Sequence, residues 1–88
     1  MLQADGSYCK IYLNDNSHIL ASKNLKYFEE KLHVSNLFFR SHKSYIVNLK
    51  YVIEIQKSEN ELKLKGNVSG LISNDKFEAF MQEMEQLA

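Results

Sequence analysis

The sequence predicts one mostly β domain with short helices, an α+β fold in which the strands run mainly antiparallel. The 88-residue chain is long enough for one small core and too short for two. Several segments place apolar residues at the spacing of strands, and two segments place them at the spacing of amphipathic helices. The connections between the expected strands are too short for crossovers. The predicted order is therefore β-β-α, then β-β-β, then a C-terminal α, in a single domain over residues 1–88.

The first elements form a predicted hairpin. Residues 8–13 are rich in β-forming side chains, and each of residues 14–17, Asn-Asp-Asn-Ser, favours a turn. Residues 18–22 are then typical of the returning strand.

A short amphipathic helix follows this hairpin. Ser22 or Asn24 can cap it, because a short side-chain oxygen accepts a hydrogen bond from a free amide of the first turn. Leu25, Phe28 and Leu32 recur at i, i+3 and i+7, which places one apolar stripe toward a core.

A polar interruption separates the next two apolar runs. Residues 37–40 and 45–48 are mainly aromatic or aliphatic, whereas residues 41–44 are Ser-His-Lys-Ser. This pattern predicts a polar loop anchored on both sides by core residues, and residues 51–56 resume the β pattern.

The C-terminal part contains the clearest strand of the chain. Residues 61–65 alternate strictly, which places two leucines on one face. Gly66-Asn67 predicts a tight turn into residues 68–73, and a helical period begins at about Asn74. The residues predicted to be largely buried in the core are Phe28, Phe38, Ile46, Val52, Leu64, Phe77 and Phe80.

The composition excludes several classes of function. No long apolar stretch and no basic run followed by an apolar one occur, so we expect neither a membrane span nor a signal peptide. Cys9 shares the apolar face of its strand, which favours a buried small side chain over a nucleophile paired with His18 or His42. The cysteine and the three scattered histidines lack the spacing of a metal site. We expect a cytoplasmic protein that is not an enzyme and requires neither metal nor cofactor.

The net charge is zero but unevenly divided. Residues 1–50 hold seven Lys or Arg against four Asp or Glu, and residues 51–88 hold four against seven, so an anionic partner prefers the first half. Within that half, residues 40–44 gather two cations, a histidine and two hydroxyls between apolar anchors, which suits phosphate and base-edge recognition. A solvated loop with a capping serine and a structural histidine accounts for the same composition.

The segment 38–48, Phe-Phe-Arg-Ser-His-Lys-Ser-Tyr-Ile-Val-Asn, resembles the central signature of the LytTR-type DNA-binding domain. That family occurs mostly as the output half of bacterial response regulators. Residues 4–8 resemble its early turn, and residues 22–29 resemble its Ser-Lys-x-Leu-x-x-Phe-Glu helix start. Residues 52–53 and 71–73 also correspond, so the resemblance covers essentially the whole chain. It implies an elongated antiparallel β-sheet fold with a C-terminal helix, which reads double-stranded DNA with loops.

The resemblance also implies which residues contact DNA. Ser7 and Lys43 fall at base-reading positions. Arg40 and Ser44 fall at positions that contact the DNA backbone, and His42 supports the same loop. The DNA-binding residues implied in this way are Ser7, Arg40, His42, Lys43, Ser44, Asn74 and Lys76.

Two departures from the family pattern bear on this function. Residues 73–76 are Ser-Asn-Asp-Lys where the family commonly has Ser-Arg-Arg, so Asn74 replaces an arginine that reads guanine and Asp75 repels phosphate. Of the first strand of the family only residues 1–3 remain. This predicts an exposed sheet edge that another chain could cover.

The predicted function is sequence-specific binding of double-stranded DNA, at paired sites, as the output domain of a bacterial two-component transcription regulator. The expected partners are duplex DNA, an upstream receiver or other signalling domain, and a second copy in a homodimer. The alternative is a degenerate LytTR-like module that retains the fold and serves protein association through the N-terminal edge. The zero net charge and the missing arginines motivate that alternative.

Overall fold

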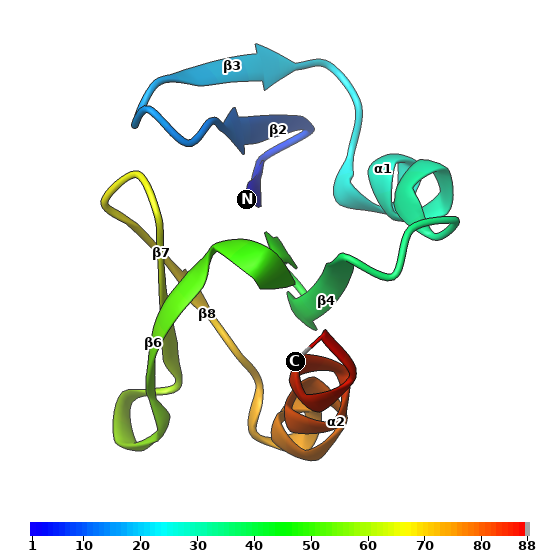
Figure 1. The fold of residues 1–88 in the computed structure, drawn as a ribbon. Helices are drawn as coiled ribbons and strands as arrows, with labels where there is room; N and C mark the ends of the chain where they lie inside the picture. The colour runs from blue at the N-terminus through cyan, green and yellow to red at the C-terminus, as the bar shows by residue number, and fades with distance from the viewer. Residues whose placement is uncertain (88) are drawn as a thin grey trace.

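The protein is built from two antiparallel sheets and two α-helices (Figure 1). The structure, a computed structural model, describes residues 1–87. One sheet has five strands in the order β3-β2-β1-β5-β4, and the other has three in the order β6-β7-β8. The strands are β1 (Leu2–Asp5), β2 (Tyr8–Tyr12), β3 (His18–Ala21), β4 (Phe38–His42), β5 (Tyr45–Asn48), β6 (Val52–Gln56), β7 (Glu61–Leu64) and β8 (Val68–Leu71). The α-helices are α1 (Leu25–Leu32) and α2 (Phe77–Leu87), and short 3₁₀ turns are η1 (Leu49–Tyr51), η2 (Lys57–Glu59) and η3 (Asn74–Lys76).

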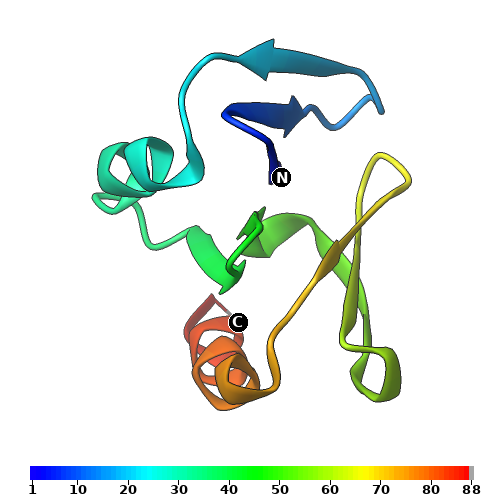
Figure 2. The same ribbon diagram turned by 180° about the vertical axis from the view of Figure 1, so that it is seen from behind.

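The two helices pack on different parts of the domain. Figures 1 and 2 show the β2–β3 hairpin at the top, α1 below it on one side, the smaller sheet on the opposite side, and α2 at the bottom. The principal extents are 32 × 26 × 22 Å, so the elongation that the resemblance implies is modest. Neither helix described within residues 1–87 is long and apolar enough to cross a membrane.

β1 is the central strand of the larger sheet, so the prediction of an exposed N-terminal edge is wrong. Leu2 pairs with Ile11 of β2 on one side and with Ile46 of β5 on the other. The pairing reaches the first residue, because the Tyr12 amide donates to the Met1 carbonyl at 2.8 Å. The predicted element order missed this strand, and five strands rather than three lie between the helices.

The predicted hairpin and first helix are confirmed. Asn24 caps α1, since its Oδ1 accepts a hydrogen bond from the Tyr27 amide at 2.9 Å. The apolar stripe of α1 covers the larger sheet and closes a first core cluster. This cluster consists of Leu2, Cys9, Leu25 and Ile46, with Phe28, Leu32 and Phe38 packed against it.

The polar loop predicted for residues 41–44 is shorter in the structure. β4 continues through His42, with an irregular register between Phe39 and His42, so the turn itself is reduced to residues 43–44. Ser41 is fully buried within β4, and its hydroxyl donates to the Leu71 carbonyl at 2.8 Å. This bond lets a hydroxyl occupy the interior at little cost, because a buried polar group is tolerated when it is satisfied.

The second core cluster lies between the two sheets and α2. Leu62 and Leu64 are buried from one face of β7, as the strict alternation predicts. The turn into β8 uses positive φ angles of 90° at Gly66 and 63° at Asn67. Phe80 of α2 is fully buried. The cluster consists of Met1, Val47, Leu49, Leu62, Leu64, Ile72, Phe77 and Phe80.

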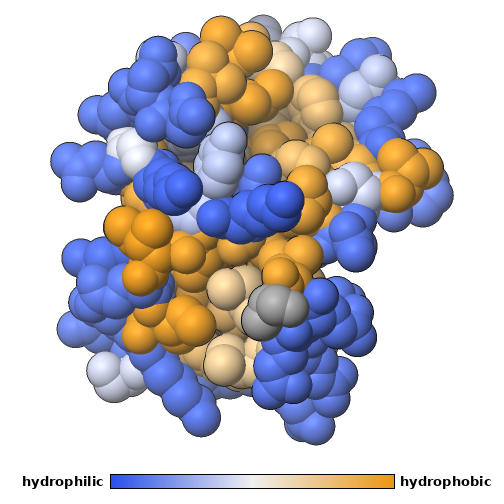
Figure 3. All heavy atoms as spheres, viewed as in Figure 1, coloured by the Kyte–Doolittle hydropathy of each residue, from blue (hydrophilic) through white to orange (hydrophobic). Residues whose placement is uncertain are grey.

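The predicted core is mainly confirmed, although its margins are more open than expected. The buried members are Ile46, Leu64, Phe77 and Phe80, and the half-buried members are Phe28, Phe38 and Val52. Apolar side chains also remain on edge strands, with Leu20 of β3 56% exposed and Ile53 of β6 64% exposed. Figure 3 shows apolar surface over both strands.

Candidate nucleic-acid interface

Three connections meet at one end of the larger sheet. They are the β1–β2 turn at residues 6–7, the β4–β5 turn at residues 43–44, and η3 before α2. The Ala4 amide donates to the Ser44 carbonyl at 2.8 Å, which places the first turn beside the second. The Ser73 amide donates to the Ser41 carbonyl at 2.8 Å, which places η3 beside the end of β4. Backbone hydrogen bonds thus gather the three segments that the resemblance assigns to DNA.

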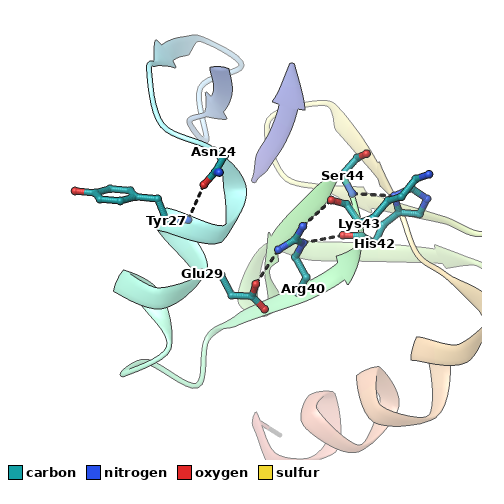
Figure 4. Close-up of polar contacts among 7 residues, drawn as sticks. All are labelled: Asn24, Tyr27, Glu29, Arg40, His42, Lys43 and Ser44. Atoms are coloured by element: carbon teal, nitrogen blue, oxygen red, sulfur yellow. Dashed lines mark hydrogen bonds and ion pairs between the residues drawn. The ribbon is translucent and has the colours of Figure 1, made fainter. Parts of the chain in front are cut away.

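The Arg40 guanidinium is engaged inside this site (Figure 4). Its Nε donates to the His42 carbonyl at 3.0 Å, and its Nη2 donates to the Lys43 carbonyl at 2.6 Å. Its Nη1 pairs with Oε1 of Glu29 on α1 at 2.7 Å, the one ion pair found among residues 1–87. The family resemblance implies a DNA-backbone contact for Arg40, whereas in the structure three acceptors of the protein already hold its guanidinium.

A backbone hydrogen bond selects one tautomer of the neutral His42 imidazole. The Ser44 amide donates to Nδ1 of His42 at 3.1 Å, so the neutral imidazole carries its proton on Nε2. The ring also meets the Tyr45 ring near edge-to-face, with centroids 5.8 Å apart. Both contacts fix the imidazole and leave Nε2–H as a donor for an outside acceptor.

Lys43 and Ser7 are the exposed polar side chains of the two adjacent turns. The Lys43 side chain extends away from Arg40 in Figure 4. Ser7 follows Gly6, whose φ of 62° allows the tight reversal between β1 and β2. A cation and a hydroxyl therefore stand on neighbouring turns with their ends toward solvent. Ser44 is half-buried beside them.

The third connection holds Asn74 through a residue that the sequence did not suggest. Nδ2 of Asn60 donates to the Ile72 carbonyl at 2.8 Å and to Oδ1 of Asn74 at 2.7 Å. Asn60 reaches both because it ends η2 in the left-handed conformation, with φ of 53°. The Asn74 amide nitrogen remains available as a donor. Asp75 and Lys76 are exposed next to it, which puts a carboxylate and a cation side by side.

Three residues that sequence reasoning did not assign to the site therefore support it: Glu29, Ser41 and Asn60. Glu29 belongs to the segment 22–29 that resembles the helix start of the family. No local sequence pattern predicts that a carboxylate on this helix pairs with an arginine 11 residues later. Ser41 was expected in a polar loop, because four polar residues in a row hide the strand that continues through Ser41 and His42. Asn60 ends the polar run 57–60, Lys-Ser-Glu-Asn, whose composition favours a turn and does not indicate a bonding partner.

The chemistry of the gathered groups is that of anion and base recognition. Across residues 1–87, no set of three or more His, Cys, Asp or Glu side chains is placed to hold a metal ion. The family model for the LytTr DNA-binding domain matches residues 1–85. Comparison with curated proteins gives no match.

Proposed function

The chain belongs to the LytTr DNA-binding domain family and binds DNA, and we propose that it reads specific double-stranded sequences as the output domain of a bacterial transcription regulator. The observation that carries this proposal is the gathering of three donor-bearing connections at one end of the larger sheet. Donors held on short turns of a sheet keep fixed spacings, and base readout depends on such spacings.

Each connection contributes a different kind of contact. Lys43 donates to the acceptor edge of a guanine in the major groove, and Ser7 reads a neighbouring base edge. His42, through its Nε2–H, and Ser44 bond to phosphate oxygens and set the register of the domain on the duplex. At η3, Lys76 neutralises a phosphate, while Asn74 donates to a base edge.

The contact at η3 is the weakest of the three. Asn74 shares its Oδ1 with Asn60, so it lacks the free amide pair needed for bidentate adenine recognition. Asp75 opposes phosphate at the same place. Affinity per domain is therefore low, and an upstream receiver domain that brings two copies to paired sites raises it through effective concentration.

The rival function, protein association through a free N-terminal edge, loses its surface in this structure. β1 is hydrogen-bonded on both sides, to β2 and to β5. The exposed apolar side chains of the edge strands β3 and β6 do not by themselves indicate a partner, so DNA recognition is the function we adopt.

Fluorescence-anisotropy titration with a duplex selected from random DNA, and with a scrambled duplex, tests the proposal. Lys43→Ala should weaken binding to the selected duplex by about 1 to 3 kcal/mol and binding to the scrambled duplex much less. Lys50→Ala is the matched control, because Lys50 is an exposed lysine just beyond the other end of β5. Binding of the wild type should weaken steeply with salt. Equal affinities of the two variants for the selected duplex would refute base reading by Lys43.

A further inference from the structure

The ion pair between Glu29 and Arg40 connects helix α1 to strand β4. Glu29 lies on the exposed side of α1, and Arg40 lies in β4, just before the turn that carries Lys43. The two side chains are 47% and 27% exposed, so the pair is at the surface rather than in the core. Neither residue belongs to a core cluster, so we expect both clusters to stay intact when the pair is removed.

The same guanidinium also holds the backbone of the turn. It donates to two successive carbonyls, of His42 and Lys43, while its third nitrogen is held by Glu29 (Figure 4). A planar guanidinium with donors in a fixed fork can bind three acceptors at once, which an ammonium group cannot do in the same geometry. The orientation of the peptide after Lys43 is thereby tied to the position of α1.

We propose that Glu29 and Arg40 are positioning residues for DNA recognition, which hold the β4–β5 turn so that Lys43 and His42 face the duplex. This inference rests on the proposed function. It gives Arg40 a role inside the protein in place of a phosphate contact, and it gives Glu29, an acidic residue, a favourable role in binding a polyanion.

Preorganisation is the physical reason for the effect. The two-residue turn follows a strand pair of irregular register, and ordering any part of it only on DNA would cost conformational entropy. A turn already ordered by the guanidinium avoids that cost on binding. Without the Glu29 carboxylate, the Arg40 guanidinium is no longer bonded to α1 and holds the Lys43 carbonyl less firmly.

The sign of the effect separates positioning from simple charge. Removing an acidic side chain from a DNA-binding protein lowers repulsion from phosphate and should strengthen binding. Positioning predicts the opposite for Glu29→Ala, a loss of about three- to fivefold on the selected duplex, the upper range for an exposed ion pair. Glu30→Ala is the matched control, because Glu30 is the next residue of α1, is exposed, and carries the same charge.

Arg40→Lys tests the second half of the pair. A lysine keeps the charge and can contact a phosphate, but it cannot replace the three-acceptor fork. The substitution should therefore weaken selected-duplex binding as Glu29→Ala does, and it should leave the slope of affinity against salt unchanged. Wild-type affinity in Arg40→Lys, or a slope lowered by about one in Arg40→Ala, would identify a direct phosphate contact and overturn the positioning role.

Two further measurements distinguish positioning from a fold defect. In a Lys43→Ala background, Glu29→Ala should weaken DNA binding less than it does in the wild type, since part of its effect acts through Lys43. In the free protein, backbone amide resonances of Lys43 and Ser44 should shift in Glu29→Ala and not in Glu30→Ala. If the wild type binds duplex and Glu29→Ala equals Glu30→Ala both in affinity for the selected duplex and in the amide shifts of Lys43 and Ser44, the inference fails and the proposed function stands. If the wild type binds no duplex, the proposed function fails, and with it the inference for DNA, whatever the amide shifts report about the turn.

Discussion

Phe80→Ala should be the most destabilising single substitution in α2. The Phe80 side chain is fully buried, and its ring lies 5.7 Å from the Phe39 ring at an interplanar angle of 67°. Removing a fully enclosed phenyl group costs about 3 to 5 kcal/mol, through lost transfer free energy and the cavity left behind. The edge-to-face pair with Phe39 accounts for about 0.5 to 1.5 kcal/mol of the coupling within that loss.

The size of this loss matters because the domain is small. At about 0.05 to 0.15 kcal/mol per residue, a chain of this length has a total stability of roughly 4 to 13 kcal/mol. Phe80→Ala therefore removes a large share of this stability and loosens the packing of α2. Helix α2 begins directly after η3, which is part of the candidate DNA interface.

A reversible urea melt followed by circular dichroism measures the effect. Met81→Ala is the control, because Met81 is the next residue of α2 and is 44% exposed, and it should change the free energy of unfolding by less than about 1 kcal/mol. Phe80→Leu should fall between the two variants. A loss below about 1 kcal/mol for Phe80→Ala, equal to that of Met81→Ala, would refute the enclosed packing of α2.

Three other predictions concern the link between the sheets, a turn and the thiol. Ser41→Ala should cost about 1 to 3 kcal/mol in the same melt, because the Leu71 carbonyl loses its buried partner; no loss would mean that the bond is dispensable. Gly66→Ala should cost about 1 to 3 kcal/mol, since φ is 90° and a Cβ would lie 2.9 Å from the Asn14 carbonyl oxygen. Gly6→Ala is its control, with positive φ but open space, and an equal loss in both would contradict the steric part. Cys9 is fully buried and burial raises the pKa of its thiol, so a thiol reagent should label it slowly in the folded protein and fast in urea; fast native labelling would place the thiol at the surface.

The elements with strong local signals were predicted correctly. The Asn24 cap, the apolar stripe of α1 and the alternation of Leu62 and Leu64 depend on neighbours within a few residues, and each is found in the structure. The family resemblance is confirmed by the match over residues 1–85. The contacts of the individual residues with DNA stay predictions.

The candidate site was predictable in its composition but not in its internal bonding. Residues 40–44 stood out as a cluster of donors. Which donors face outward depends on partners elsewhere in the chain, because Arg40 is held by Glu29 and Ser41 is held by Leu71. Neither partner can be identified from spacing along the chain.

The sequence by itself determined the local elements, the apolar stripe of α1 and the buried face of β7, because periodicity, caps and turn residues act over short stretches of chain. The motifs of the sequence also determined the family. Only the tertiary structure decided that β1 is a central strand and that the three connections meet. Strand order depends on hydrogen bonds between segments far apart in the sequence, and a short strand shows its own pattern but not its neighbours. The same holds for Arg40. From the sequence its guanidinium was expected to be available to DNA, but in the fold it is hydrogen-bonded to Glu29, His42 and Lys43.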